Sequence, residues 1–272
     1  MKKIIATIVC TMCTAAICAQ LVWLSVDKQP FAGTYSRNFQ QLLTALQNQA
    51  ALAYIPVVTA GVSTERRFLL KAISTHAAAL AVPVRHGAFG LHLQQSGYTD
   101  YRRQAIGFSY GRTLGDRFSI GMQADYLSEI IPQYTTTATV VFELGCLMHL
   151  TSQLHMGLHV FNPTAGNTQS LGKNKVPAIY SVGLGYEVSA NFLLSTAVTQ
   201  ETDAATLAKV MCEYRIIKQL SLQLGMSTDP QLNSMAIGIS LRLLYIQLSV
   251  SHHPQLGLTP ATAIVWQLKQ RQ

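Results

Sequence analysis

The strongest constraint in this sequence is a two-residue alternation that runs from about Tyr54 to Leu268. Apolar residues alternate there with small or polar ones. The stretch Arg117–Tyr126 shows this clearly, with an apolar set of Phe118, Ile120, Met122, Ala124 and Tyr126. Successive side chains of a β-strand point to opposite faces of the sheet, so the pattern indicates strands with one apolar and one small or polar face. Because it recurs with turns between, it predicts an all-β fold.

The composition indicates the environment of these strands. Hydrophobic residues make up 49% of the 272 residues and charged residues only 12%, about half of the usual charged fraction. After the N-terminal segment there is no apolar run of roughly 18 residues, which excludes a bundle of membrane-spanning helices. A transmembrane antiparallel β-barrel reconciles these facts, because its hydrophobicity is spread over alternate positions. We therefore expect one barrel domain in the cell outer membrane.

The N-terminus reads as a secretory signal peptide over residues 1–19. Lys2 and Lys3 form a basic start, Ile4–Ile17 an apolar core, and Ala19-Gln20 a cleavage site. Lipidation of Cys18 is disfavoured because Ile17 is too bulky for the residue before a lipidated cysteine. We expect residues 20–53 to form a plug segment and residues 54–272 the barrel.

Five cysteines are present, but only two follow the predicted signal peptide. Cys10, Cys13 and Cys18 lie within it, so the C-x-x-C spacing there is neither a redox nor a zinc motif. Cys146 and Cys212 fall on non-adjacent predicted strands, both on the lipid-facing side. We expect two buried free thiols and no disulfide.

The formal net charge is +8, but the basic residues are scattered and no basic stripe with interleaved aromatics occurs. Nucleic acid is therefore not an expected partner. Solvated strand ends and membrane-edge anchors are favoured over an anionic ligand site for Arg85, Arg112, Arg117, Arg215, Lys218 and Arg242. The expected partners are outer-membrane lipid and the barrel-assembly machinery.

A short amphipathic helix is predicted before the barrel, over Arg37–Gln49, with Ser36 as a candidate N-cap. Apolar residues recur there at helical spacing, and the candidate plug residues are Phe39, Leu42, Leu43, Leu46 and Asn48. The inward positions of the strands carry unusually small residues. Either the lumen is open, or a segment packs closely against the wall, and this helix is the natural occupant.

About fourteen strands are predicted, with twelve or sixteen as alternatives. They lie near 54–62, 72–83, 87–97, 102–112, 117–129, 136–149, 152–161, 177–188, 191–199, 205–215, 219–228, 233–241, 244–252 and 260–268. Tight turns alternate with mostly longer connections, which is typical of outer-membrane barrels with short periplasmic turns and longer external loops. Both termini then fall on the short-turn side, and the longest loop, Asn162–Lys175, is expected at the surface.

Ionisable and polar side chains are predicted to face the lumen at Asp125, Glu143, His155, His159, Glu187, Lys209 and Glu213. Such groups usually pair, hydrate or contact a plug, so a structural polar network is favoured over a transport or proton path. His155, His159 and nearby His149 could suggest a metal site. However, residues four apart in a strand lie about 13 Å apart, too far for one ion. We expect no metal and no cofactor.

A hydrolase would need a nucleophile, a base and an orienting group near one rim. Ser251-His252-His253 offers two of these residue types at a loop edge, but no recognisable signature surrounds it. The histidine pair is better explained as a solvated loop pair. We therefore expect a protein without enzymatic activity.

Several segments resemble one barrel family over roughly residues 50–268: Asn48–Ala53, Glu65–Lys71, Ile106–Gly111, Phe118–Gly121 and Gly157–Pro163. Their order is similar to that of the FadL-like barrels of Bacteroidota outer membranes, in particular the PorV/PorQ group. Asn48–Ala53 stands where that group has an N-P-A-G-L-A-like motif. The resemblance implies a fourteen-stranded barrel with an N-terminal plug.

The sequence departs from the family pattern at two places. Gln49 and Ala51 replace the proline and glycine of the motif, and the end Trp266–Gln272 lacks the terminal aromatic of barrel-assembly signals. The resemblance implies two alternative functions: passage of small apolar solutes, or binding of an exported protein in type IX secretion or surface assembly. An apolar ligand would need plug movement or a gap in the wall, for which Pro56 and Pro83 are candidates.

Overall fold

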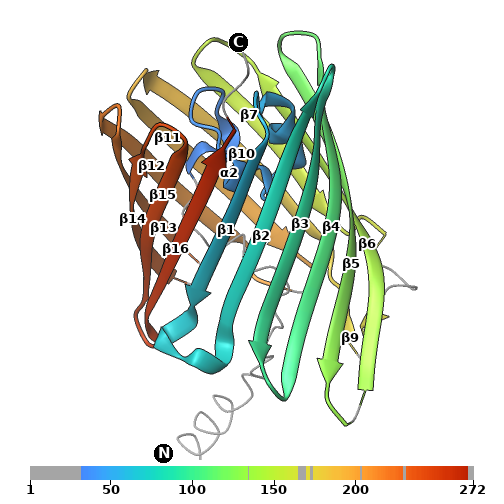
Figure 1. Cartoon of the computed structure of the whole chain (residues 1–272). Helices are drawn as coiled ribbons and strands as arrows, with labels where there is room; N and C mark the ends of the chain where they lie inside the picture. Colours follow the sequence, from blue (N-terminus) through green and yellow to red (C-terminus); the bar gives the residue numbers. More distant parts are fainter. Residues whose placement is uncertain are drawn as a thin grey trace, which may run out of the picture.

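The computed structural model describes residues 32–133, 135–164, 170–171, 174–202, 204–228 and 231–268. Its body is a closed barrel of fourteen antiparallel strands (Figure 1), which confirms the predicted fold class. The strands are β1 Thr59–Arg66, β2 Ser74–Val84, β3 Gly87–Tyr98, β4 Tyr101–Leu114, β5 Phe118–Ile131, β6 Thr135–His149, β7 Leu154–Phe161, β10 Ile179–Ser189, β11 Phe192–Glu201, β12 Leu207–Ile217, β13 Leu220–Thr228, β14 Gln231–Ser240, β15 Leu244–His253 and β16 Gly257–Gln267.

Pairing of the first and last strands closes the ring, with Ala60 of β1 opposite Trp266 of β16. Neighbours in the chain are neighbours in the barrel except that β7 pairs with β10, because the short strands β8 (Ser170–Leu171) and β9 (Asn174–Lys175) form a separate two-stranded sheet. A closed ring leaves no unpaired strand edge, which is the condition for a sheet to span lipid.

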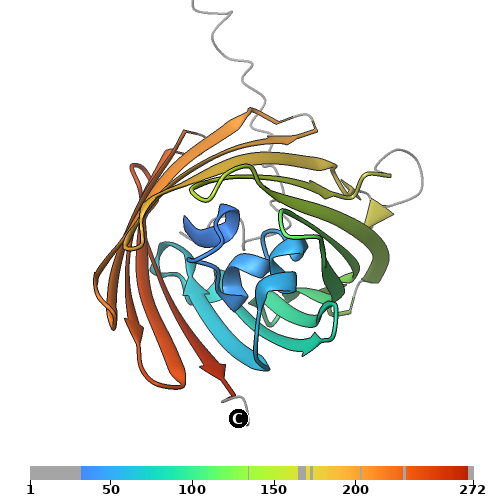
Figure 2. The same cartoon turned by 90° about the horizontal axis from the view of Figure 1, so that it is seen from above.

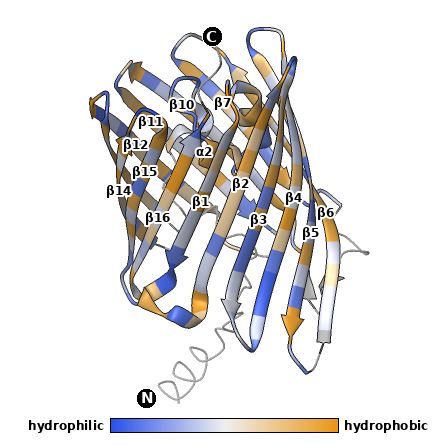
Figure 3. Cartoon of the chain, viewed as in Figure 1, coloured by the Kyte–Doolittle hydropathy of each residue, from blue (hydrophilic) through white to orange (hydrophobic). Residues whose placement is uncertain are grey.

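The two faces of the wall follow the predicted alternation. Large apolar side chains cover the outside, as in Phe108 (58% exposed) and Met226 (67% exposed), whereas Ser109 and His155 on the inside are buried. Figure 3 shows the resulting change between hydrophobic and hydrophilic positions along each strand. Such an exterior requires a lipid surrounding, so the chain is an outer-membrane barrel. None of the described helices is long and apolar enough to cross a membrane.

The structure refines several predicted boundaries. The first strand was expected over 54–62 but β1 begins at Thr59, because residues up to Tyr54 belong to a helical turn inside the barrel. Cys146 and Cys212 are free thiols as expected, although both are half-buried rather than buried. Residues 1–19, which carry the predicted signal peptide, and the terminal residues 269–272 lie outside the described residues.

The two prolines lie just beyond the pairing of β1 with β2, which begins with Thr59 opposite Ala81. Pro56 precedes β1, and Pro83 of β2 stays in register with Ala88 of β3. Register shifts occur elsewhere, between Glu187 and Ser189 of β10 and between Arg215 and Ile217 of β12. Neither proline is part of the β1–β2 pairing, so a gap at this place in the wall stays a prediction.

The long connection after β7 is only partly an exposed loop. Asn162 and Val176, at its two ends, are buried, and the Asn162 Nδ2 group donates to the Val176 carbonyl at 2.8 Å. Val176 packs with Phe161 and Ile179 on the lumen side of the wall. Residues 165–169 and 172–173 of the predicted loop Asn162–Lys175 lie outside the described residues.

Residues 32–54, which we call the plug, lie inside the ring (Figure 2). The helix predicted over Arg37–Gln49 is much shorter, since only α2 (Leu42–Ala45) is α-helical. It is flanked by the 3₁₀ turns η2 (Ala32–Tyr35) and η3 (Gln49–Tyr54). Ser36 caps a separate turn, its Oγ accepting from the Phe39 amide at 3.0 Å. The plug follows the curved wall in short turns because a straight helix could not contact so many strands.

Glycines of the wall permit the plug to approach this closely. A side chain at Gly183 or Gly185 of β10 would collide with Tyr35, and one at Gly121 of β5 would collide with the backbone of Gln49. The small lumen residues therefore do not leave an open pore at this level. They make room for backbone-to-backbone and ring-to-backbone contact.

We expect Gly185→Ala to displace the plug without unfolding the barrel, because its new methyl group would overlap the Tyr35 carbonyl oxygen. Overpacking of this kind costs about 1–3 kcal/mol. Hydrogen exchange should become faster in residues 32–54 while the barrel remains resistant to unfolding in detergent. Ser181→Ala, also lumen-facing on β10, is the control. Equal exchange in both variants would contradict the close-packing argument.

Candidate functional site

The candidate site is the contact between the plug and the lumen wall, at the end of the barrel where all connections between strands are short (Figure 1). There η3 packs against β3–β6, η2 against β7 and β10–β12, and α2 against β1 and β2. The plug residues expected from sequence lie in this contact: Phe39, Leu42, Leu43 and Asn48 are buried, and Leu46 packs against the same apolar core.

Glu187 near the end of β10 anchors the start of the plug. Its Oε1 atom accepts hydrogen bonds from the Ser36 hydroxyl at 2.7 Å and from the backbone amides of Arg37 and Asn38 at 2.8 and 3.1 Å. Its Oε2 atom accepts from the Asn38 side-chain amide at 2.5 Å. Successive amides aimed at one carboxylate form an anion-binding nest, so the plug binds the wall through a charge-assisted contact.

Two histidines extend this contact along the wall. His155 Nε2 lies 3.1 Å from Glu187 Oε1, and His155 Nδ1 lies 2.8 Å from His149 Nδ1. If His155 is neutral with its proton on Nε2 toward the carboxylate, its Nδ1 accepts and His149 donates from Nδ1. The His149 ring also packs edge-on against Tyr54 of the plug, with centroids 5.1 Å apart.

A second buried carboxylate, Glu143 of β6, anchors the middle of the plug. Gln49 donates from Nε2 to Glu143 Oε2 at 2.5 Å, and His159 of β7 lies 2.9 Å from the same oxygen. Gln123 of β5 joins this carboxylate to Asp125, with its Nε2 atom 3.4 Å from Glu143 and 2.8 Å from Asp125. Side chains of β5 and β7 thus support the β6 carboxylate that binds the plug.

Asn48 inserts into the wall itself. Its Nδ2 atom lies 3.2 Å from the carbonyl oxygens of both Cys146 and Leu158, which face each other across β6 and β7. Its Oδ1 atom accepts from the Ala50 amide at 3.1 Å and so starts η3. A Cβ atom at Gly145 would collide with this side chain, so the position depends on a glycine in the wall.

Arg215 of β12 holds the opposite side of the plug. Its guanidinium group lies 3.8 Å from the centroid of the Phe39 ring and donates to the Asn38 carbonyl at 2.7 Å. The expectation that Arg215 is a solvated strand end or membrane-edge anchor is therefore wrong. The two-residue period counted from Glu213 already places Arg215 on the lumen face, and this signal was sufficient to find it.

The two remaining predicted lumen residues lie on β12. Glu213 is buried and accepts from Gln223 of β13 at 3.0 Å. Lys209, four positions earlier on β12, is half-buried opposite Ser227. Sequence reasoning missed Tyr35 and Gln49, because nothing in a two-residue or helical period distinguishes a plug residue that reaches the wall from one that faces the solvent.

The geometry separates the groups that could suggest other chemistry. His155 and His159 are bound to different carboxylates, and the described residues hold no group of three His, Cys, Asp or Glu side chains arranged for a metal ion. In Ser251-His252-His253, the Nδ1 atom of His253 accepts from the amides of Gln255 and Leu256 at 3.1 and 3.2 Å. His253 therefore stabilises the turn before β16.

Comparison with known proteins finds likeness in structure alone. No family model matches the sequence, and no curated protein matches it. Among solved structures, the CymD monoaromatic hydrocarbon channel superposes with a TM-score of 0.63 at 11% identity, covering 85% of this chain and 94% of the other. The Ralstonia pickettii toluene transporter TbuX gives 0.64 at 9% identity, covering 88% and 97%.

A FadL homologue from Pseudomonas aeruginosa is also similar, with a TM-score of 0.59 at 12% identity over 86% of this chain and 94% of the other. Identities this low establish a shared fold: this barrel is FadL-like in architecture. Such low identities do not identify the solute or the partners of this chain, because one fold can serve several functions.

We expect Glu187→Gln to loosen the plug, because an amide offers one acceptor oxygen and places its NH₂ group against the donors of residues 36–38. Hydrogen bonds to a charged group contribute about 1.5–3 kcal/mol. Hydrogen exchange at residues 36–40 should accelerate accordingly. Glu65→Gln, which changes a buried lumen carboxylate paired with Arg67 at the end of the barrel opposite the plug, should leave that exchange unchanged. The opposite ranking would contradict the role given to Glu187.

Proposed function

We propose that this barrel passes small apolar solutes across the outer membrane and that the plug must shift for a solute to pass. The fold it shares with a monoaromatic hydrocarbon channel and a toluene transporter, over 85% and 88% of this chain, supports the proposal. The observation that carries it is a lumen filled at one end by residues of the same chain, bound to the wall largely through polar groups.

The closed ring of paired strands favours a route past the plug over a route through the side of the barrel. The β1–β2 pairs, from Thr59 opposite Ala81 to Arg66 opposite Ser74, and the β2–β3 pairs follow one another without a register shift. The two register shifts adjoin Glu187 and Arg215. A bulge re-aims the side chains beside it, so these irregularities serve the plug contacts.

The energetics favour a local shift over complete removal of the plug. Phe39, Leu42, Leu43 and Leu52 are each almost fully buried, and exposing a side chain of this kind costs about 1.5–3 kcal/mol. Four of them together make an emptied lumen too rare for transport. The polar anchors are different, since each net contribution is only about 0.5–3 kcal/mol and water can replace it. Release of one anchor is therefore the accessible motion.

The proposal predicts that Glu187→Gln raises the uptake of a small aromatic hydrocarbon such as toluene. Loss of about 1.4 kcal/mol from the closed state increases the open population about tenfold. Uptake of the radiolabelled solute would be measured in cells whose outer membrane contains this barrel and no other hydrocarbon channel. Deletion of residues 36–49 should raise it further.

Two controls make this experiment decisive. Glu65→Gln should behave as the unchanged protein, because this buried carboxylate pairs with Arg67 at the end of the barrel opposite the plug. A small sugar of similar size should gain much less than the hydrocarbon. Unchanged uptake after deletion of the plug would refute plug gating. Equal gains for sugar and hydrocarbon would refute a preference for apolar solutes.

A binding component of a type IX secretion or surface-assembly complex is the second candidate. It is favoured by the burial of the plug, which is what a permanently closed barrel requires, and by the β8–β9 hairpin beyond β7. Gentle detergent extraction followed by mass spectrometry discriminates the two. A stoichiometric partner protein that is lost when residues 162–175 are cut supports the scaffold, whereas an apolar molecule without a protein supports the channel.

A further inference from the structure

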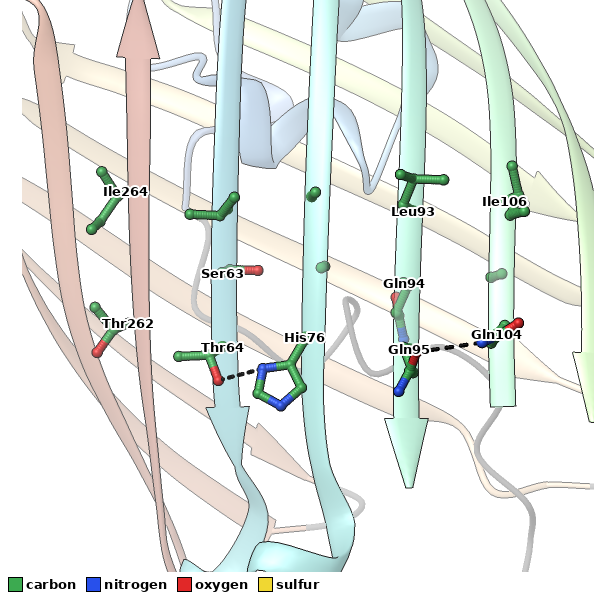
Figure 4. Close-up of a pocket in the computed structure, with 14 residues that line it drawn as sticks. Ser63, Thr64, His76, Leu93, Gln94, Gln95, Gln104, Ile106, Thr262 and Ile264 are labelled. Carbon is green, nitrogen blue, oxygen red and sulfur yellow. Dashed lines mark hydrogen bonds between the residues drawn. The ribbon is translucent and has the colours of Figure 1, made fainter. Parts of the chain in front are cut away.

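The outer face of the barrel carries a groove that the plug and the lumen do not explain. It has a volume of about 590 Å³ and crosses β16, β1, β2, β3 and β4 (Figure 4). The register places Val62, Ala78, Leu93 and Ile106 side by side on four neighbouring strands. Ala78 is the small member of this row, so the surface dips between its larger neighbours and leaves room for an apolar chain.

A row of polar side chains borders the groove on its other side. Thr262, Thr64, His76, Gln95 and Gln104 are consecutive cross-strand neighbours. Thr64 Oγ1 lies 3.0 Å from His76 Nδ1, and Gln104 donates to Gln95 Oε1 at 3.3 Å, both at exposed positions (Figure 4). Such groups are costly in hydrocarbon. The row therefore marks the level at which the polar part of the lipid begins.

The position of the row identifies the leaflet. Gln95 and Gln104 lie three positions from the end of the β3–β4 hairpin, where Tyr98 faces Tyr101. This end of the barrel lies opposite the plug (Figure 1) and carries the long connections from β1 to β2 and from β7 to β10. Because the longer loops of outer-membrane barrels are external, the polar row lies at the outer leaflet.

Two arginines stand just beyond the row on the same outer face. Arg66 lies two residues after Thr64 on β1, and Arg102 lies two residues before Gln104 on β4, so both are displaced toward the same end of the barrel. Arg66 is paired with Ser74 of β2, and Arg102 is paired with Gly97 of β3. Three strand spacings separate them, roughly 14 Å. Arg66 is exposed, whereas Arg102 is half-buried and its buried Nε atom has no hydrogen-bond partner. The nearby carboxylates Glu65 and Glu129 occupy lumen-facing positions and pair with other arginines.

We propose that this groove binds a glycolipid of the outer leaflet that carries two phosphate groups. One acyl chain lies on the apolar row over Ala78, and the polar row contacts the amide, ester and hydroxyl groups of the headgroup. Arg66 and Arg102 each bind one phosphate, since they are too far apart to share one. The site lies on the outer wall, so it is independent of whether the lumen conducts a solute or the barrel serves as a scaffold.

The test uses the full chain in neutral detergent, titrated with a purified bis-phosphorylated lipid A and followed by native mass spectrometry. The double variant Arg66→Gln/Arg102→Gln should lower the apparent affinity at least about tenfold, because it removes two charge-assisted contacts. Ala78→Phe fills the groove and should reduce binding to a similar extent with both arginines in place. Dephosphorylated lipid A and phosphatidylethanolamine should bind weakly to the unchanged protein.

Arg112→Gln is the matched control, because Arg112 lies on the same outer face of β4 at its opposite, exposed end. It should bind as the unchanged protein does. Each variant would first be shown to remain a folded barrel by its shift in electrophoretic mobility on heating. If Arg112→Gln and the double variant bound the lipid equally, the loss of affinity would reflect the net charge of the protein and not this site, and the proposal would be overturned. Unchanged binding by Ala78→Phe, or displacement of the lipid by toluene at equal concentration, would also overturn it.

Discussion

The requirement that every backbone polar group in lipid has a partner underlies the rest of this structure. Pairing of β1 with β16 closes the ring and meets that requirement. Closure divides the side chains between an outer face that must be apolar and an inner face that need not be. A ring of about eight strands is filled by its own side chains, whereas fourteen strands enclose more space than side chains can occupy. Residues 32–54 fill that space at one end.

The plug combines two kinds of contact with different consequences. Glycines at positions such as 183 and 185 bring its backbone against the wall, and apolar side chains such as Leu42 and Leu43 make it costly to remove. Glu143 and Glu187 fix its orientation through directional hydrogen bonds. A segment that is hard to extract but held in register by replaceable polar bonds suits a gate that shifts locally. The same arrangement also suits a permanent seal, as a scaffold barrel would require.

Much of the fold could be predicted from the two-residue period. It predicted fourteen strands and most of their boundaries, as well as the separation of Phe108 from Ser109 across the wall. It placed the carboxylates of Glu143 and Glu187 in the lumen but did not identify their hydrogen-bond partners. The period determines which face of the sheet a side chain occupies, but not its height in the barrel or the residues beside it. The helix expected over Arg37–Gln49 was too long. The helical spacing of Leu42 and Leu46 shows that the two side chains face the same way, but it does not require helical hydrogen bonds along the whole segment.

The sequence by itself determined that the chain is a membrane barrel, because alternation is a property of each strand and needs no knowledge of its neighbours. The tertiary structure alone decided what closes the lumen and where lipid meets the wall. Gln49 donates a hydrogen bond to Glu143, which is 94 positions away in the sequence. The groove over Ala78 is lined by residues of five strands, including the first and the last strand of the barrel. Such sites depend on the register between strands, which ring closure sets and no local pattern encodes.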